Sequence, residues 1–349
     1  MTATLTVPQD VLERFGLTGA EAAPLGARLI NHTWLIVPPG GQKLVLQRVN
    51  AIFPPAVNDD IAVVTQHLAA AGLETPTLVP ARDGALWVES EGNWRVLTHI
   101  AGTCRNALEN AAQAREAGAL LGRFHRSLAG LEHRFAASRL GVHDTARHLG
   151  TLERALDEHH GHPDYGLIAP LGNRILEMAA ALAPLPATPD RIVHGDPKIN
   201  NVIFAAGSDR ARCLIDLDTL GPMPLPLELG DAFRSWCNPG SEDTTETSFS
   251  LEAFGAAVEG YAAATAGFIE PGECAAIVPA TLTILVELAA RFCADALNES
   301  YFGWDAARFP SRSVHNRIRA EGQLREFASL REQRAAAESL VERAVSPAR

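Results

Sequence analysis

Short apolar segments separated by polar turns fill the first hundred residues. Four of these segments, rich in Val, Leu, Ile and Trp, lie at 28–37, 43–49, 85–88 and 94–100. Runs of this kind, bounded by Gly, Pro and Asn, are typical of β-strands. One helical pattern interrupts them at 54–72, where apolar residues share one face at Val57, Ile61, Val64 and Leu68. The pattern predicts a small antiparallel sheet that carries one helix.

Helical spacing of apolar residues dominates the chain after residue 107. The first helix is expected around 117–131, and others are expected at 171–184, 250–268, 273–298 and 317–345. Three short strand-like segments lie inside this region, at 191–194, 201–204 and 212–216. An all-helical domain does not need such strands, so a hairpin that carries a site is expected there. The sequence therefore predicts an α+β fold with an N-terminal lobe at 1–101 and a larger, mainly helical lobe at 102–349.

Composition narrows the class of protein. The 349 residues include 30 Lys and Arg against 41 Asp and Glu, a net charge of −11 without a long basic stripe. Neither a nucleic acid nor a membrane surface is therefore an expected partner. The most apolar stretch, 274–286, is too short to span a bilayer and predicts a buried helix. The first residues lack the pattern of a signal peptide, and a cytoplasmic protein is expected. The pattern does not indicate an oligomeric state.

The residues with the clearest chemistry lie in IVHGDPKINNVIF and in the following CLIDLDTLGP. Phosphoryl transfer needs a carboxylate at the attacking hydroxyl, oxygen ligands for Mg²⁺, and a cation near the transferred group. Asp196 suits the first role and Lys198 the last, and Asn201 and Asp216 suit the metal. Two hairpin-linked loops can bring these side chains together. The ordered set predicts a phosphotransferase site.

Two neighbouring residues allow more than one interpretation. Asp218 is either a second Mg²⁺ ligand or a loop cap, because Asp side chains often bond nearby backbone amides. We assign it an accessory metal role. His194 is interpreted as a scaffold residue, and a metal-ligand role is the alternative.

The segments HGDPKINN and IDLDT resemble the aminoglycoside phosphotransferase and choline kinase superfamily, which has a protein-kinase-like two-lobed fold. The segments INHTW, LQRVN, DIAVVTQHL, LGDAFR and ARFCADAL…YF resemble the N-acetylhexosamine 1-kinases of that superfamily. The resemblance implies a kinase that uses ATP and Mg²⁺ to phosphorylate the anomeric hydroxyl of an N-acetylhexosamine. The alternatives are an aminoglycoside or other small-alcohol phosphotransferase, and a nucleotide-binding pseudokinase module.

The same resemblance implies a nucleotide site in the first lobe. The loop at 26–33 is expected to cover the phosphates, and the residues expected to contact the nucleotide are Gly26, Asn31, Thr33, Arg48, Thr98, His99 and Ile100. Arg48 is the expected cation of its strand, and Gln47 and Lys43 are the alternatives. Gln47 and Arg48 must point to opposite faces of the sheet. The helix acid that pairs with the cation is left open between Asp59 and Asp60.

Residues late in the chain are expected to shape the acceptor site. Besides Asp196, the expected acceptor contacts are Arg234, Arg291 and Tyr301. Asp231 resembles an aspartate that braces the catalytic loop, and Asp295 is either a hydroxyl contact or a helix-pair partner of Arg291. One departure from the 1-kinase pattern is Leu29, which stands where a histidine is expected.

Overall fold

The computed structural model describes residues 6–26, 30–137 and 142–346. The chain forms two compact units. The first consists of Met1–Ala101 with Gly130–Ser138, and the second of Gly102–Ala129 with Arg139–Arg349. The segment 130–138 thus joins the first unit, although the sequence analysis assigned it to the helical lobe.

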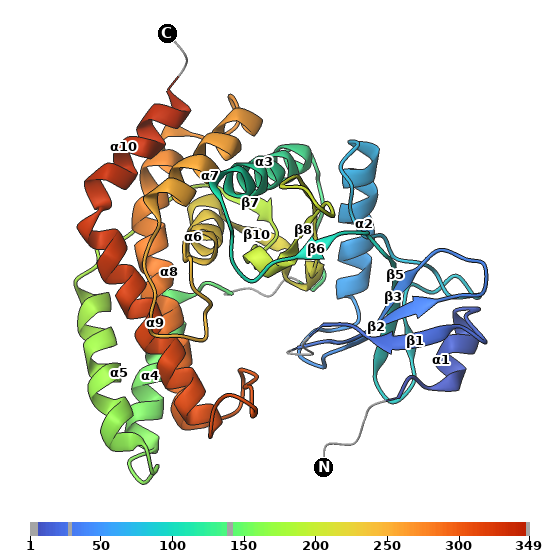
Figure 1. The fold of residues 1–349 in the computed structure, drawn as a ribbon, viewed down its shortest axis with the longest axis horizontal. Helices are drawn as coiled ribbons and strands as arrows, with labels where there is room; N and C mark the ends of the chain where they lie inside the picture. Colours follow the sequence, from blue (N-terminus) through green and yellow to red (C-terminus); the bar gives the residue numbers. More distant parts are fainter. Residues whose placement is uncertain (1–5, 27–29, 138–141, 347–349) are drawn as a thin grey trace. The chain divides into compact units, whose positions relative to one another are not determined.

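The first unit is an antiparallel sheet with strand order β1-β2-β3-β5-β4 (Figure 1). Its strands are β1 (Glu21–Pro24), β2 (His32–Val37), β3 (Leu44–Val49), β4 (Val88–Glu89) and β5 (Asn93–Thr98). Two helices accompany them, α1 (Gln9–Arg14) and α2 (Val57–Ala70). The predicted sheet with one amphipathic helix is therefore present, and α1 and β1 are additions to it.

The two faces of this sheet differ in character because side chains alternate along each strand. One face forms the core of the unit together with α1, through Val11, Leu12, Trp34, Ile36, Leu46, Trp94 and Val96. Residues one position along, such as Gln47 and Arg95, point to the other face, where Arg95 bonds Asn58 of α2. The α2 face of the sheet is thus partly polar.

Asp60 of α2 anchors the segment 130–137 to the first unit. Its carboxylate accepts hydrogen bonds from the backbone nitrogens of Ala136 and Ala137 at 3.0 and 2.9 Å. His133 Nε2 lies 2.8 Å from the same carboxylate. Both carboxylate oxygens are therefore engaged by this segment, which explains how a buried acid is tolerated on α2.

The second unit is mainly helical (Figure 1). Its helices are α3 (Ala111–Leu128), α4 (Thr145–Glu158), α5 (Tyr165–Ala180), α6 (Leu225–Trp236), α7 (Leu251–Ala264), α8 (Pro271–Asn298), α9 (Arg312–Glu332) and α10 (Arg334–Val345). α8 packs against α4, α5, α6, α9 and α10. It is long and apolar enough to cross a membrane, but 83% of its most apolar window is buried inside the fold. The predicted buried helix is confirmed.

Short strands carry the predicted site within the second unit. β7 (Asp190–Val193) pairs with β10 (Gly221–Pro224), and β8 (Val202–Phe204) lies between β6 (Thr103–Cys104) and β9 (Ala211–Leu214). Two 3₁₀ turns, η1 (Ile199–Asn201) and η2 (Leu217–Thr219), connect them. The three short strands predicted from the sequence therefore belong to two small antiparallel sheets. Hydrogen bonds join the loops of these sheets.

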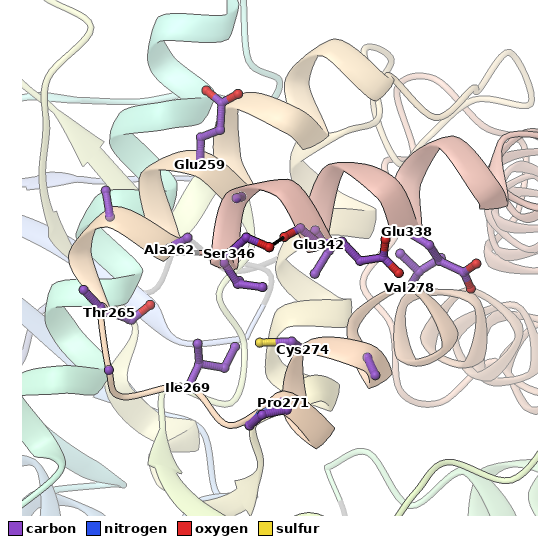
Figure 2. Close-up of a pocket in the computed structure, with 17 residues that line it drawn as sticks. Glu259, Ala262, Thr265, Ile269, Pro271, Cys274, Val278, Glu338, Glu342 and Ser346 are labelled. Atoms are coloured by element: carbon purple, nitrogen blue, oxygen red, sulfur yellow. Dashed lines mark hydrogen bonds between the residues drawn. The ribbon is translucent and has the colours of Figure 1, made fainter. Parts of the chain in front are cut away.

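A surface pocket of about 970 Å³ lies elsewhere in this unit, between α7, α8 and α10 (Figure 2). Apolar groups such as Ile269 and Val278 line it, with the carboxylates of Glu259, Glu338 and Glu342. None of the residues predicted from the sequence lines this pocket.

Candidate active site

The loop 194–201, which carries the predicted base Asp196 and is called the catalytic loop here, begins where β7 ends. Its backbone conformation depends on a glycine. Gly195 has a φ of +82°, and a Cβ at this position would overlap the carbonyl oxygen of Thr219. Only glycine fits both the left-handed backbone and the close approach. The Thr219 hydroxyl also donates to the His194 carbonyl at 2.8 Å. The turn therefore holds the following Asp196 close to η2.

Two further hydrogen bonds join the catalytic loop to the loop after β9. His194 Nε2 lies 2.9 Å from the Ile215 carbonyl oxygen, and the Ile215 nitrogen donates to the Asn201 carbonyl at 2.9 Å. Ile215 directly precedes Asp216. The structure thus ties together the two loops that carry the predicted carboxylates, and His194 has the scaffold role that we preferred.

Asp196, Lys198 and Asn201 interact directly. Lys198 Nζ lies 2.9 Å from Asp196 Oδ2. The Asn201 amide nitrogen donates to the Asp196 carbonyl at 2.8 Å and lies 3.5 Å from Asp196 Oδ2. Burial lowers the pKa of Lys198, but the charges of Asp196, Glu242 and Asp216 outweigh it, so the pKa lies above its ordinary value. Lys198 is therefore a permanent cation beside the expected base.

The predicted metal ligands offer oxygen atoms. Because the Asn201 amide nitrogen bonds the loop, its amide oxygen is the atom that it can offer a cation. Asp216 has a left-handed backbone, with φ +66° and ψ +58°, which costs about 1–3 kcal/mol in a non-glycine residue and often marks a functional site. Asp218 is buried in η2. A carboxylate, an amide and substrate phosphates together form the hard donor set that Mg²⁺ favours.

No group of three or more His, Cys, Asp and Glu side chains in the described part of the chain is arranged to hold a metal ion. The set proposed from the sequence has a different composition, since one ligand is an amide and others come from the nucleotide. Asn201 and Asp216 fit such a set, and their assignment stays a prediction.

Glu228 supports the backbone of the catalytic loop, and the sequence analysis did not identify it. Its fully buried carboxylate accepts hydrogen bonds from the backbone nitrogens of His194 and Gly195, each at 2.9 Å. Trp236 of the same helix donates to the Pro197 carbonyl at 2.8 Å. Helix α6 therefore holds the backbone of the catalytic loop on both sides of Asp196. The sequence feature that could have identified Glu228 is its position as the one charged residue in the apolar segment LPLELG.

Arg234 does not have the position expected of an acceptor contact. It is 4% exposed, and its guanidinium binds Asp231 at 2.8 Å and also Glu242. Burial lowers the pKa of Arg234, but these two carboxylates raise it above the ordinary value. This burial and pairing argue against the predicted acceptor contact of Arg234. Asp231 binds Arg234, and its expected role in bracing the catalytic loop stays a prediction.

The turn that follows α8 carries the aromatic residues predicted to meet the acceptor. The Asp295 carboxylate accepts from the backbone nitrogens of Ser300, Tyr301 and Phe302 at 2.8–2.9 Å. Arg291 lies over the ring of Phe302 at 5.6 Å. Asp295 is therefore a cap for this turn rather than the helix-pair partner of Arg291. Tyr301 remains 44% exposed.

Asp243 and Arg319 hold the segment that follows this turn. Arg319 donates to Asp243 at 2.7 Å and to the Gly303 carbonyl at 2.8 Å. The adjacent Glu242 acts on Lys198 through its charge. The sequence analysis identified neither Asp243 nor Arg319.

The predicted nucleotide residues of the first unit lie in or near strands β1, β2, β3 and β5. Asn31 Oδ1 accepts from the Asn50 nitrogen at 2.9 Å, and the Thr98 hydroxyl accepts from the Thr77 nitrogen at 2.9 Å. Gly26 has a φ of +76°. Burial, and then the charge of Lys43, lower the pKa of His99. Ile100 follows, half-buried. Residues 27–29, and with them the departure at Leu29, lie outside the described residues.

Arg48 and Gln47 point to opposite faces of the sheet, as expected. Arg48 lies on the α1 face, where it donates to the Glu91 carbonyl and lies 6.0 Å from the ring of Trp94. Gln47 points to the α2 face and donates to the Thr33 hydroxyl at 3.3 Å. The position of Arg48 therefore argues against its predicted contact with the nucleotide phosphates.

Comparison with known structures shows the same fold. An aminoglycoside phosphotransferase from Alicyclobacillus acidocaldarius is 15% identical, with 96% of this chain and 98% of that chain covered and a TM-score of 0.57. A microcompartment-associated aminopropanol kinase is 17% identical, with 95% and 98% covered and a TM-score of 0.59. An amicoumacin kinase in complex with AMP-PNP and Ca²⁺ is 14% identical, with 88% and 91% covered and a TM-score of 0.57.

These likenesses confirm the predicted kinase-like fold, in which an N-terminal antiparallel sheet precedes a mainly helical region. The names of the three proteins refer to chemically different acceptors, so the fold alone does not identify the substrate. A family model described as the phosphotransferase enzyme family matches residues 21–268, more than half of the chain. The chain therefore belongs to the phosphotransferase enzyme family and is a small-molecule kinase of that family.

Proposed function

We propose that this kinase transfers the γ-phosphoryl group of ATP to the anomeric hydroxyl of an N-acetylhexosamine. In this reaction the Asp196 carboxylate orients the sugar hydroxyl and takes its proton as the oxygen–phosphorus bond forms. Lys198, bound to Asp196 at 2.9 Å, keeps that carboxylate in place and offsets negative charge. Asn201 and Asp216 would hold Mg²⁺, which neutralises charge on the phosphates when bound. ADP leaves, and the proton stays on Asp196 until solvent removes it.

The observation that supports an uncharged acceptor is the ion pairing of acidic side chains in the second unit. A polycationic aminoglycoside needs carboxylates that can face its ammonium groups. Four carboxylates of the second unit already bind basic side chains, in the pairs Asp231–Arg234, Glu242–Arg234, Asp243–Arg319 and Glu287–His143. This pairing favours an uncharged acceptor, which needs directional hydrogen bonds instead.

The turn after α8 supports an acceptor that has an apolar group. The Tyr301 and Phe302 rings lie 4.8 Å apart in an edge-on arrangement, and Arg291 lies over Phe302. The exposed ring of Tyr301, beside the Phe302 ring that Arg291 covers, suits a sugar that bears an acetamido methyl group. These residues belong to the segments that resemble N-acetylhexosamine 1-kinases.

The test is a panel of acceptors with the site of phosphorylation assigned by ³¹P NMR. N-acetylglucosamine and N-acetylgalactosamine are expected to give sugar 1-phosphates, and kanamycin is expected to give no product. A Tyr301→Ala variant should raise KM for the sugar while leaving KM for ATP unchanged. An Asp196→Asn variant, which lacks the proposed base, is the negative control for product formation.

Two outcomes would overturn the proposal. Phosphorylation of kanamycin with no sugar 1-phosphate would make the chain an antibiotic-modifying kinase. Binding of ATP without phosphorylation of any acceptor in a broad panel would favour the pseudokinase alternative.

A further inference from the structure

A pocket outside the catalytic loop occupies the space between α7, α8 and α10 (Figure 2). All of its lining residues belong to the second unit. Its volume of about 970 Å³ is that of a small-molecule site, for which about 300–1,000 Å³ is typical. Ile269, Val278 and Val341 form apolar walls, and small residues such as Ala262 and Ala266 leave the space open. The pocket is therefore a second place in the fold that is large enough for a small molecule.

The charged groups that line the pocket are all carboxylates. Glu259 pairs with Arg115 at 2.6 Å, and Glu338 pairs with Arg334 at 2.7 Å. Glu342 lies one turn after Glu338 on α10, and its carboxylate forms no ion pair with any residue that the structure describes. A carboxylate without a cation beside apolar walls is complementary to a ligand that has one positive charge.

The other polar groups of the pocket leave little for a sugar or a nucleotide to bind. The Thr265 hydroxyl donates to the Tyr261 carbonyl at 2.8 Å, and the Ser346 hydroxyl donates to the Glu342 carbonyl at 2.7 Å. Burial raises the pKa of the Cys274 thiol, which therefore stays uncharged. The hydroxyl protons are thus already used within the protein, and the pocket suits a ligand with an apolar body.

One wall of the pocket is bonded to the strand that leads to the catalytic loop. This wall is the loop 265–270, which joins α7 to α8 and includes Ile269. Arg191 of β7 lies over the Phe268 ring at 4.4 Å and binds Glu273 at 2.6 Å. A shift of this wall therefore requires Arg191 to move or to lose its contacts, and β7 directly precedes the catalytic loop.

Helix α7 forms another wall and reaches the same loop through buried side chains. Tyr261 directly precedes Ala262 of the pocket, and its hydroxyl lies 3.0 Å from His125 Nδ1. His125 Nε2 lies 3.4 Å from Glu228 Oε1. The Glu228 carboxylate accepts the backbone hydrogen bonds that hold the start of the catalytic loop. Two walls of the pocket are thus in contact with the groups that position this loop.

We propose that this pocket is an effector site, which binds a small molecule with an apolar body and one ammonium group. The ammonium pairs with Glu342, and the apolar body packs against Ile269, Val278 and Val341. An occupant favours the arrangement of α7 and of the loop 265–270 to which it binds, and through their contacts it stabilises the catalytic loop. The inference goes beyond the acceptor proposed above and does not depend on it.

Binding of 1-naphthylmethylamine to the full chain tests the ligand class, with 1-naphthylmethanol as the uncharged analogue. Calorimetry should show that the amine binds about fivefold more tightly than the alcohol, the effect of one partly exposed ion pair. Glu342→Gln should abolish this preference without changing the affinity for the alcohol. Glu252→Gln is the matched control, because Glu252 is an exposed glutamate of α7 that does not line the pocket. Ala262→Phe, which fills part of the pocket, should weaken both ligands by about tenfold or more.

Hydrogen–deuterium exchange tests the effector role. Saturating amine should slow the exchange of residues 190–201 by about fivefold or more. Arg191→Gln should keep the affinity for the amine and lose part of this protection, because the contact of β7 with the pocket wall is removed.

Equal binding of the amine and the alcohol, or a preference that survives Glu342→Gln, would overturn the proposed ligand class. Amine binding that is unaffected by Ala262→Phe would place the ligand elsewhere. Binding that leaves exchange of residues 190–201 unchanged would overturn the effector role. Glu342 is exposed, so its variant is expected to fold even if Ala262→Phe does not. No nucleotide or acceptor is present in these measurements, so their results are independent of the acceptor proposal.

Discussion

Replacement of Glu228 by Gln tests whether α6 positions the catalytic loop. The variant keeps the shape of the side chain but turns one acceptor oxygen into an NH₂ group, which faces a backbone N–H of His194 or Gly195. One charge-assisted hydrogen bond is lost in a fully buried place, a change of about 1.5–3 kcal/mol. If this energy positions Asp196, kcat should fall by about 10- to 100-fold, since each 1.4 kcal/mol is a factor of ten.

A coupled assay with saturating ATP and acceptor measures this effect, and KM for ATP should change little. Glu273→Gln is the matched control, because Glu273 is also buried and binds Arg191 and the backbone nitrogen of Glu270. Both variants should lose thermal stability, but only Glu228→Gln should lose kcat. A kcat within twofold of wild type in Glu228→Gln, or an equal loss of kcat in both variants, would refute the reasoning.

Three further predictions concern the catalytic residues and a buried ion pair. Asp196→Asn should lower kcat by about 10²- to 10⁴-fold and leave ATP affinity intact in calorimetry; near-normal turnover would contradict its role as base. Asp216→Ala should raise the Mg²⁺ concentration for half-maximal activity by about tenfold or more, and an unchanged Mg²⁺ titration would exclude it as a ligand. Burial lowers the pKa of His143, but the hydrogen bond and charge of Glu287 raise it above the ordinary 6.5. The stability from this pair should therefore be complete below pH 6.5 and decline as pH rises through the raised pKa. Melting temperatures between pH 6 and 9 should show a decline that is smaller in His143→Gln, and identical slopes in the two proteins would contradict the assignment.

Helix periodicity predicted the elements whose apolar residues are regular. The patterns at 250–268 and 273–298 correspond to α7 and α8. The pattern at 317–345 is two helices, α9 and α10, which are separated at Gln333. Three of the described helices were not predicted, namely α1, α4 and α6. α4 begins at a local cap, since Asp144 accepts from the Arg147 nitrogen, whereas α6 starts with proline-rich sequence that resembles a loop.

The loops of the candidate site were predictable because their residues are close in sequence. Asp196, Lys198 and Asn201 lie within six residues, and the hairpin from β8 to β9 returns the chain to Asp216. A short motif with strand-like flanks therefore contained both the residue types and their approximate placement.

By itself the sequence determined the elements with regular apolar spacing, the family motifs and the two loops that carry the carboxylates, because short-range spacing controls backbone conformation and turn geometry. Only the tertiary structure decided which face of β3 meets α2, and hence that Gln47 and Arg95, not Arg48, lie there. It also decided that Glu228 supports the loop at His194, 34 residues earlier. The alternation of side chains along a strand does not show which of its two faces meets a helix. Likewise, the hydrogen-bond donors of a buried carboxylate depend on which segments pack against it. Both choices depend on contacts between segments far apart in the chain, and a local pattern does not contain them.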